Sequence, residues 1–147
     1  MSIRAATSDD LTSVREIAEA AYLPYVAAIG KKPAPMVADF ASQIANGQVW
    51  LFSDEEIVLG YVVAYPSGGA MQLENIAVDP AFHGRGVGKA LVTYVEKAAR
   101  RQGLKAVELY TNIKMTGNLS WYPAIGYSET GRAREAGFDR VFFRKDL

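Results

Sequence analysis

The hydrophobic residues of this chain recur with two spacings, one typical of a helix and one typical of strands. The helical spacing is clearest where the apolar positions follow one helix face: Val87, Ala90, Leu91, Tyr94, Val95 and Ala98. Residues spaced in this way lie on one side of a helix and predict an amphipathic helix that packs on a core. Gly103, which follows Arg100 and Arg101, indicates where that helix ends.

The remaining pattern predicts a chain of mixed helices and strands. Alternating or continuous apolar runs predict strands at residues 2–7, 48–54, 57–67, 70–80 and 105–111, then a hairpin of 127–133 and 139–145. Helices are predicted at about 8–28, 36–47 and within 116–127, with Pro24 kinking or shortening the first. No internal repeat, low-complexity segment or linker interrupts this order, so we expect residues 1–147 to form one domain.

The fourth predicted strand changes its hydrophobic phase halfway along. Met71 and Leu73 are apolar at odd positions, whereas Ile76 and Val78 are apolar at even positions. A strand points successive side chains to opposite faces, so one buried face takes both pairs only if an extra residue lies between them. The sequence therefore predicts a β-bulge near residues 74–75. The alternative is a strand buried on both faces, in which the phase carries no meaning.

Composition and charge argue against several classes of protein. The 147 residues are 50% hydrophobic and 22% charged, which is typical of a folded globular chain. The 16 basic and 16 acidic side chains give a formal net charge of +0, so we expect no nucleic-acid partner. With no cysteine and one histidine, we expect neither a disulfide framework nor a metal site. No apolar run suits a membrane span or a secretory signal, so we expect a cytoplasmic protein without a membrane partner.

The segment HGRGVGKAL, residues 83–91, places three glycines and two cations directly before the amphipathic helix. A nucleoside triphosphate loop would need a glycine at His83 and a hydroxyl at Ala90. A dinucleotide loop would need a third glycine at Lys89 or Leu91, so the chain has neither pattern. A helix N-terminus preceded by small residues still presents free N–H groups to an anion. The loop therefore indicates either an anion site or a simple turn before a helix.

Further motifs lie around this loop with a defined spacing. The sequence Val-Asp-Pro at residues 78–80 precedes it, and a run of the form N-x-x-x-Y-x-x-x-G-Y lies at residues 118–127. Together with the order of elements, these motifs resemble the GNAT superfamily of acyl-CoA-dependent N-acetyltransferases from end to end. The superfamily's [QR]-x-x-G-x-[GA] signature falls on His83, Gly86 and Gly88, where His83 departs from the usual Gln or Arg.

The resemblance implies an α+β fold with three layers, α/β/α. Its mixed, mostly antiparallel sheet has six or seven strands, and about four helices pack against it. The fourth strand of such a sheet is bulged and splays away from the fifth, which agrees with the change of phase in the fourth predicted strand.

The resemblance also implies acetyl-CoA as the acyl donor. Its pyrophosphate would bind the N–H groups of the glycine loop, and its pantetheine arm would pair with the fourth strand as an added strand does. A free N–H around Ile76 would stabilise negative charge on the acetyl oxygen. The residues implied to bind acetyl-CoA are Ile76, Ala77, Val78, His83, Gly84, Arg85, Gly86, Val87, Gly88, Lys89, Asn118 and Tyr122.

The activity implied is direct transfer of the acetyl group to a primary amine in a ternary complex. The amine must lose a proton before it attacks, and the departing thiolate should gain one. Glu74, at the expected bulge, is the candidate general base, directly or through water, and Tyr122 is the candidate general acid. The alternatives are a solvated carboxylate at Glu74 and a tyrosine that only packs in the core at Tyr122.

The acceptor, an amine of a small molecule or a peptide, is expected between the first two helices and the end of the fifth strand. The candidate residues there are Tyr22, Tyr25, Met36, Tyr110 and Asn112, although ordinary helix packing also explains the aromatic and methionine positions. Because the chain has no net charge, the composition favours neither an acidic nor a basic acceptor. The oligomeric state is not indicated by the sequence, and a homodimer is one option. Two other functions stay open: a non-catalytic module that binds or senses acyl-CoA, and a structural domain whose glycine loop is only a turn.

Overall fold

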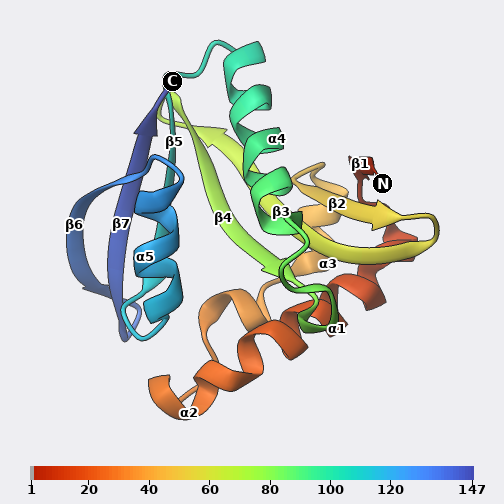
Figure 1. Ribbon diagram of the computed structural model, residues 1–147, viewed down its shortest axis with the longest axis horizontal. Helices are drawn as coiled ribbons and strands as arrows, with labels where there is room; N and C mark the ends of the chain where they lie inside the picture. Colours follow the sequence, from red (N-terminus) through yellow and green to blue (C-terminus); the bar gives the residue numbers. More distant parts are fainter. Residues whose placement is uncertain (1) are drawn as a thin grey trace.

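The computed structural model describes residues 2–147, and their strands form one mixed sheet. The strands are β1 (Ser2–Ala5), β2 (Val49–Asp54), β3 (Ile57–Ser67), β4 (Ala70–Val78), β5 (Ala106–Asn112), β6 (Ser128–Glu135) and β7 (Phe138–Asp146). The sheet has seven strands in the order β1-β2-β3-β4-β5-β7-β6 (Figure 1). Only β4 and β5 are parallel, and the other neighbouring pairs are antiparallel. The expected α+β fold with a mixed, mostly antiparallel sheet is confirmed.

Helices connect the strands at the places that the sequence predicts, with one difference. They are α1 (Leu11–Tyr22), α2 (Val26–Ile29), α3 (Phe40–Ala45), α4 (Val87–Arg101) and α5 (Thr116–Ala124), with 3-10 turns at Ser8–Asp10, Leu23–Tyr25, Ala34–Val37 and Pro80–Phe82. Pro24 lies in the 3-10 turn that separates α1 from α2, so it interrupts the first predicted helix as expected. The prediction of a helix from residue 36 is wrong at its start. The side chain of Asp39 accepts a hydrogen bond from the N–H of Ser42 at 3.2 Å and caps the helix there.

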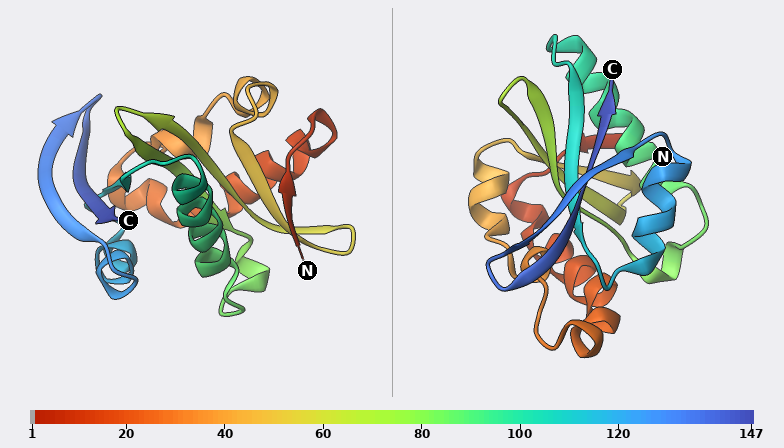
Figure 2. Two further views of the ribbon diagram at one scale, coloured as in Figure 1. Left: turned by 90° about the horizontal axis from the view of Figure 1, so that it is seen from above. Right: turned by 90° about the vertical axis from the view of Figure 1, so that its left-hand side faces the viewer.

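Helices cover both faces of the sheet, so the fold has the three expected layers (Figure 2). On one face α1 and α3 pack on β2 and β3, with buried residues that include Val14, Ile17, Phe40, Leu51, Tyr61 and Val63. On the other face α4 and α5 pack on the sheet, with buried residues that include Leu91, Val95, Val62, Leu73, Val107 and Phe143. Burying one such side chain stabilises the fold by about 1.5–3 kcal/mol relative to leaving it exposed.

Strand β4 contains the bulge that its change of phase predicts. Residues 63 and 64 of β3 are consecutive, yet they pair with Asn75 and Leu73 respectively, so Glu74 is an extra residue between them. As a result Leu73 and Ile76 both contact the core beneath α4. Glu74 and Asn75 both hydrogen-bond to side chains outside that core. The predicted bulge is therefore confirmed.

Strands β4 and β5 separate soon after they meet. They pair at two positions only, Met71 with Val107 and Gln72 with Glu108. Figure 1 shows the two strands diverging beyond that point. The second half of β4 therefore has a strand neighbour on its β3 side alone, and the expected splay is confirmed.

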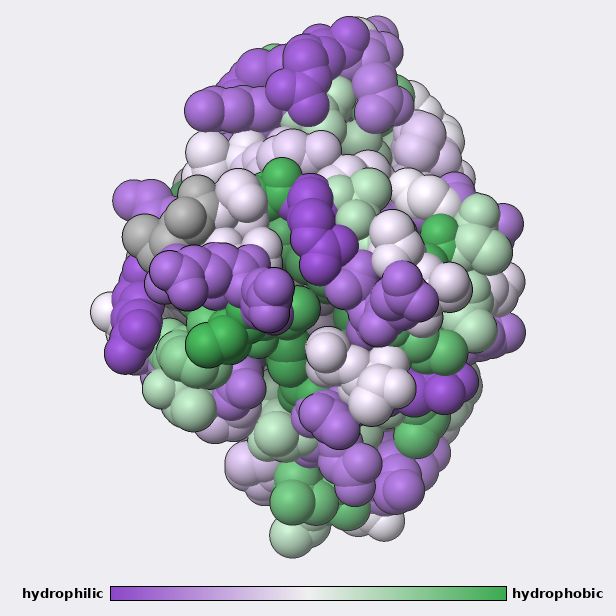
Figure 3. Space-filling view, turned by 90° about the vertical axis from the view of Figure 1, so that its right-hand side faces the viewer, coloured by the Kyte–Doolittle hydropathy of each residue, from purple (hydrophilic) through white to green (hydrophobic). Residues whose placement is uncertain are grey.

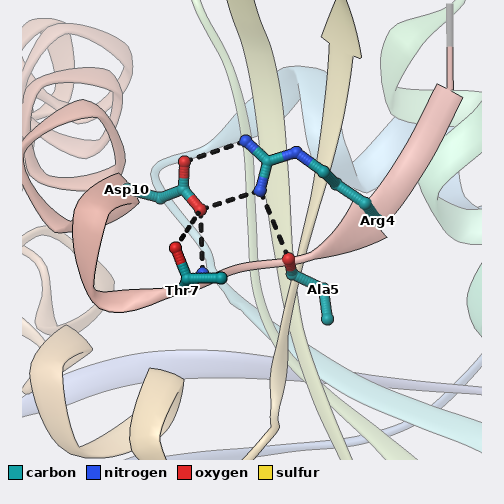
Figure 4. Close-up of polar contacts among 4 residues, drawn as sticks. All are labelled: Arg4, Ala5, Thr7 and Asp10. Carbon is teal, nitrogen blue, oxygen red and sulfur yellow. Dashed lines mark hydrogen bonds and ion pairs between the residues drawn. The ribbon is translucent and has the colours of Figure 1, made fainter.

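The corner between β1 and α1 is fixed by a bidentate ion pair (Figure 4). Two guanidinium nitrogens of Arg4 donate to the carboxylate of Asp10 at 2.8 and 2.9 Å, and the N–H of Thr7 donates to Asp10 Oδ2 at 2.8 Å. Asp10 is 8% exposed. These contacts, led by the hydrogen bond from Arg4, lower the pKa of Asp10 to about 2.

Figure 3 shows the face that carries β1 and the β2–β3 hairpin. Polar side chains cover its upper end, where the last turn of α4 carries Arg100 and Arg101. These cations lie at the negative end of the helix dipole, which they stabilise. Within residues 2–147, no helix combines the length and the apolar character needed to cross a membrane.

Candidate active site

The first turn of α4 presents unpaired main-chain N–H groups. Gly84 and Gly86 take left-handed conformations, with φ of 78° and 77°, which glycine adopts without steric cost. Gly86 is the N-cap of α4, and within residues 2–147 no side chain caps this N-terminal end of the helix. The N–H of Ala90 makes the first helical hydrogen bond, to the oxygen of Gly86 at 3.0 Å. The N–H groups of residues 87–89 are therefore free to bind an anion at the positive end of the helix.

The edge of β4 that faces away from β3 presents a second set of main-chain groups, which no neighbouring strand pairs. The N–H of Asp79 donates to the oxygen of Leu59 at 2.8 Å, so these two residues form a hydrogen-bonded pair. Hydrogen-bonded and non-hydrogen-bonded pairs alternate along an antiparallel ladder. Val78 and Ile76 therefore occupy non-hydrogen-bonded pairs with β3, and their N–H and C=O groups point into the gap that β5 has left.

A cavity of about 490 Å³ joins these two sets of groups. Its lining residues come from α1, α4, α5, β4 and the glycine loop: Ala21, Tyr22, Tyr25, Ile76, Ala77, Val78, Phe82, His83, Gly84, Gly86, Val87, Gly88, Lys89, Met115, Gly117, Asn118, Trp121 and Tyr122. We call it the donor cavity. The structure brings together around it every residue implied to bind acetyl-CoA except Arg85, whose guanidinium lies over the ring of Phe82, 5.3 Å from its centroid.

Gly88 and Trp121 lie next to each other in the lining of the donor cavity. A Cβ atom on Gly88 would lie 3.4 Å from Cη2 of Trp121, which is ordinary contact distance. A longer side chain at this position would have to displace Trp121 or Val78, two other residues of the lining, or extend into the cavity. Sequence reasoning missed Trp121 and Met115, although each lies three residues from Asn118 and therefore near its face of α5.

A second cavity, of about 50 Å³, shares five lining residues with the first: Tyr22, Ile76, Met115, Asn118 and Tyr122. Its other lining residues come from β4, β5, β7 and the segment before α3: Pro33, Ala34, Pro35, Leu73, Glu74, Asn75, Tyr110, Thr111, Asn112, Phe138 and Arg140. We call it the acceptor cavity. Both candidate catalytic residues line it, and Tyr122 lines both cavities.

Glu74 is held by two neutral hydrogen-bond donors. Its Oε2 accepts from Nε2 of Gln43 at 2.6 Å, and its Oε1 accepts from the hydroxyl of Tyr65 at 2.9 Å. Burial and the contact with Glu74 raise the pKa of Tyr65 to about 12, so this hydroxyl remains a donor at neutral pH. The half-buried Glu74 is thus an oriented carboxylate rather than a freely solvated one.

Tyr122 is 3% exposed and lies among other aromatic rings. Its ring centroid is 5.0 Å from that of Trp121, 5.8 Å from that of Tyr127 and 5.6 Å from that of Phe143. Burial raises the pKa of Tyr122, so the hydroxyl keeps its proton at neutral pH. Pro123 lies in the last turn of α5, where a missing N–H disrupts little of a short helix.

A buried hydrogen-bond network surrounds Asn75, which lines the acceptor cavity, and it includes Tyr22, which lines both cavities. The hydroxyls of Tyr22 and Tyr61 donate to Asn75 Oδ1 at 2.9 and 3.0 Å, and Asn75 Nδ2 donates to the oxygen of Pro35 at 3.0 Å. Tyr22 Oη also lies 2.9 Å from the oxygen of Ile76, so its single proton is shared between two acceptors. Tyr22, a candidate acceptor residue, therefore braces β4.

The other candidate acceptor residues are distributed differently. Tyr110 and Asn112 line the acceptor cavity, whereas Tyr25 lines the donor cavity. Met36 is 8% exposed, belongs to the core beneath α1 and lines neither cavity, because the 3-10 turn there points it inward. Sequence reasoning missed Phe138 and Arg140 of β7. Among residues 2–147, no three His, Asp or Glu side chains gather closely enough to hold a metal ion.

Asn118 joins α5 to β5 at the boundary of the two cavities. Its Nδ2 donates to Oγ1 of Thr111 at 3.1 Å and lies 3.7 Å from Sδ of Met115. This contact orients the start of α5, and with it Tyr122 one turn later.

Comparison with known proteins agrees with this architecture. A family model described as "Acetyltransferase (GNAT) family" matches residues 11–127. The chain is 32% identical over 97 residues to the probable N-acetyltransferase family 8 member 5 of Mus musculus, a match that covers 62% of this chain and 43% of the mouse protein. It is 30% identical over 102 residues to the aminoglycoside N(6')-acetyltransferase type 1 of Salmonella typhimurium, covering 69% of this chain and 66% of that protein. The chain thus spans less than half the length of the mouse relative.

A solved structure shares the fold over nearly the whole chain. It is the PaiA N-acetyltransferase of Thermoplasma acidophilum in complex with coenzyme A, with a TM-score of 0.79 and 16% sequence identity. The superposition covers 99% of this chain and 98% of that one. At this level of identity the likeness concerns the fold.

Proposed function

The chain belongs to the GNAT acetyltransferase family, and from this premise we propose that it transfers the acetyl group of acetyl-CoA directly to a primary amine of a small molecule or peptide. The observation that carries the proposal is the meeting of the donor and acceptor cavities at Tyr122. The donor cavity offers N–H groups that suit a phosphate, and a strand edge that suits an extended arm with amide groups. The other offers an oriented carboxylate, Glu74.

The residues of the donor cavity suit coenzyme A. The free N–H groups of residues 87–89 would bind its pyrophosphate, and Lys89 adds a positive charge beside them. The outward N–H and C=O groups of Ile76 and Val78 would pair with the amides of its pantetheine arm. Bound acetyl-CoA supplies an activated acetyl thioester. The coenzyme A named with the PaiA structure supports this use of the fold.

Glu74 is proposed as the general base. An aliphatic amine is protonated at neutral pH and cannot attack until it loses a proton. Glu74 lines the acceptor cavity, and the hydrogen bonds from Gln43 and Tyr65 keep its two oxygens in place. Each of these oxygens keeps a further lone pair with which to accept the proton, directly or through water.

Tyr122 is proposed as the general acid that protonates the leaving thiolate. Its raised pKa keeps it protonated, which is the state an acid needs. The same burial disfavours a bare thiolate in this cavity and so raises the thiol's affinity for a proton as well. Because burial raises the pKa of both the Tyr122 hydroxyl and the coenzyme A thiol, the free-energy cost of moving the proton from one to the other is smaller than the raised pKa of Tyr122 alone suggests.

The reaction balances around these two residues. A bond forms between the amine nitrogen and the acetyl carbon, and the carbon–sulfur bond of the donor breaks. The ammonium ion loses one proton to Glu74 before attack, and the nitrogen loses a second proton as the amide forms. Tyr122 gives one proton to the departing thiolate and recovers one as the second nitrogen proton is lost. Glu74 passes its proton to solvent, which is the one proton that the overall reaction releases. The outward N–H of Ile76 is placed to stabilise the negative charge on the acetyl oxygen.

Thiol release from acetyl-CoA across a broad panel of amines and peptides tests the proposal, with the N-acetylated product identified by mass. We expect turnover with at least one class of primary amine. Coenzyme A should also raise the unfolding temperature, because a ligand that binds only the folded state stabilises it. A clear thermal shift without turnover would instead favour a module that senses acyl-CoA, and no shift would favour a structural domain.

A further inference from the structure

Arg140 differs from the other ion-paired arginines described in this chain. Its side chain is only 13% exposed, and its one ion pair within residues 2–147 is with the half-exposed Glu135, at a long N–O distance of 3.8 Å. By contrast, four other arginines each donate hydrogen bonds to carboxylates at 2.8 to 3.2 Å: Arg4, Arg132, Arg134 and Arg144. A guanidinium has five N–H donors, and burying it without hydrogen bonds costs free energy. Arg140 therefore has donors to spare.

Aromatic rings fix the direction of these donors. The guanidinium carbon of Arg140 lies 4.2 Å from the centroid of the Tyr110 ring and 5.8 Å from that of Phe138. Stacking of this kind holds the planar group in one orientation and leaves its edges available for hydrogen bonds. All three side chains line the acceptor cavity. The spare N–H donors are thus held at the wall of the site where the amine would bind.

The acceptor cavity carries one charge of each sign. Glu74 of β4 and Arg140 of β7 are the charged side chains among its described lining residues. Strand β5 lies between β4 and β7 in the sheet. Since neighbouring strands are about 4.8 Å apart, the main chains of Glu74 and Arg140 are roughly 10 Å apart or more. Tyr110 of β5 lies between them: burial raises its pKa, the charge of Arg140 lowers it and the charge of Glu74 raises it. The phenol therefore lies within electrostatic reach of both charges.

We propose that the acceptor is an amino acid, whose carboxylate binds Arg140 while its amine faces Glu74. This inference rests on the proposed acetyl transfer to an amine. A zwitterion places one positive and one negative charge against the negative and positive charges of the cavity wall. A guanidinium edge binds a carboxylate through two parallel hydrogen bonds. A phosphate dianion would leave a negative charge uncompensated, and a polycation would meet Arg140 with a like charge.

The size of the cavity agrees with a slender acceptor. Its volume of about 50 Å³ accommodates the end of a short chain rather than a bulky group. The amine of such an acceptor would point toward Tyr122, where the two cavities share their lining.

Calorimetric binding to the protein saturated with coenzyme A tests this inference without any turnover. The probes are glycine, L-alanine, β-alanine and 4-aminobutyrate, each beside its own carboxamide, with aminomethylphosphonate as a phosphate analogue. We expect at least one carboxylate to bind about tenfold or more tightly than its carboxamide, as hydrogen bonds to charged groups allow. Carboxamides that bind equally well, a stronger phosphonate, or no binding of any amino acid would overturn the inference.

Variants identify the arginine responsible. Arg140→Gln should bind carboxylate and carboxamide alike, Arg140→Lys should keep part of the preference, and Glu135→Gln should keep all of it. Arg134→Gln removes the same charge from an exposed position of the same hairpin and serves as the matched control. A preference that survives in a folded Arg140→Gln protein would contradict the proposal. Acetyl transfer that fails for every amine while Arg140 still selects carboxylates would count against the proposed activity alone.

Discussion

The hydroxyl of Tyr22 lies 2.9 Å from the carbonyl oxygen of Ile76, at the bulged part of β4 that faces the donor cavity. A side chain of α1 therefore holds the main chain on which the proposed binding of acetyl-CoA depends. Tyr61 supports the same network through Asn75, which keeps a hydrogen bond if Tyr22 loses its hydroxyl.

Tyr22→Phe is expected to loosen this segment without unfolding the protein. The lost hydrogen bonds should reduce the free energy of unfolding by about 1 kcal/mol. The KM for acetyl-CoA should rise several-fold, while kcat changes less. Thermal unfolding and initial rates measure both effects. Tyr94→Phe is the control, because its ring packs against Trp50 and lines neither the donor nor the acceptor cavity. Equal behaviour of the two variants would show that Tyr22 has no particular role in binding acetyl-CoA.

Tyr122→Phe tests the general acid. Removing a proton donor used in the transition state should lower kcat by about 100-fold. The affinity for coenzyme A should stay nearly unchanged, because the ring that lines the cavity remains. Calorimetric titration with coenzyme A and steady-state kinetics separate the two quantities. An unaltered kcat would exclude Tyr122 as the acid.

The pH profile of the wild-type protein adds a second test of Tyr122. Because its pKa is raised, the hydroxyl should stay protonated beyond the ordinary range of tyrosine. We therefore expect no loss of kcat from this group up to about pH 10, the usual tyrosine value. A decline of kcat between pH 8 and pH 9 that disappears in Tyr122→Phe would contradict the raised pKa.

Glu74→Gln tests the general base through its dependence on pH. At neutral pH the acceptor is an ammonium ion, so the variant should lose about 100-fold in kcat/KM. Near pH 10 much of an aliphatic amine is already neutral, so the rate should recover toward that of the wild type. Glu108→Gln, which removes a carboxylate bound to Gln72 and Arg144 outside both cavities, should behave as wild type. A loss of equal size at every pH would show that Glu74 only supports the structure.

Gly88→Leu tests the donor cavity. The side chain would extend from a position where a Cβ already reaches contact distance to Trp121. We expect a loss of more than tenfold in the affinity for coenzyme A, measured by calorimetry. Gly88→Ala is the matched control: it should keep most of the affinity and slightly stabilise the helix. Equal affinity of the leucine variant and the wild type would place coenzyme A elsewhere.

The ion pair between Arg4 and Asp10 predicts how stability depends on pH. Asp10 has a folded pKa of about 2 and an ordinary value of 3.8. Its contribution is therefore present above about pH 4 and is lost as the pH falls through 2. Since Arg4 is 46% exposed and water screens the pair, we expect a contribution of about 1 kcal/mol. Urea unfolding of Asp10→Asn should show this deficit at pH 7 and progressively less of it as the pH falls from 4 through 2, with Asp9→Asn as the control.

Features that depend on local periodicity could be predicted from the sequence. The helix α4 follows from one apolar face, and the bulge at Glu74 follows from the period of two in a strand. The residues of the glycine loop indicate free N–H groups at a helix start, whereas the splayed strand and the cleft beside it were implied by the resemblance to the GNAT superfamily. The segment 83–89 and the strand before it supply half of the residues that line the donor cavity.

Features that depend on distant contacts could not be predicted. The sequence gives no sign of what Asn75 contacts, and its side chain accepts hydrogen bonds from Tyr22 and Tyr61, which reach it only through the fold. The sequence does not distinguish Arg140 from Arg134 on the same hairpin, although one is nearly buried and the other is exposed. Arg134 lies on the edge strand β6, whereas Arg140 lies on β7, between β5 and β6, and contacts the ring of Tyr110. No local pattern encodes these neighbours.

A single-turnover experiment tests the central claim of direct transfer most directly. The protein is mixed with one equivalent of isotope-labelled acetyl-CoA and an amine that it turns over, and the label is located by mass spectrometry. We expect the label to appear on the amine nitrogen in step with the release of coenzyme A, with none on the protein. An acetylated protein that forms first and then reacts with the amine, or labelled acetate as the sole product, would contradict it.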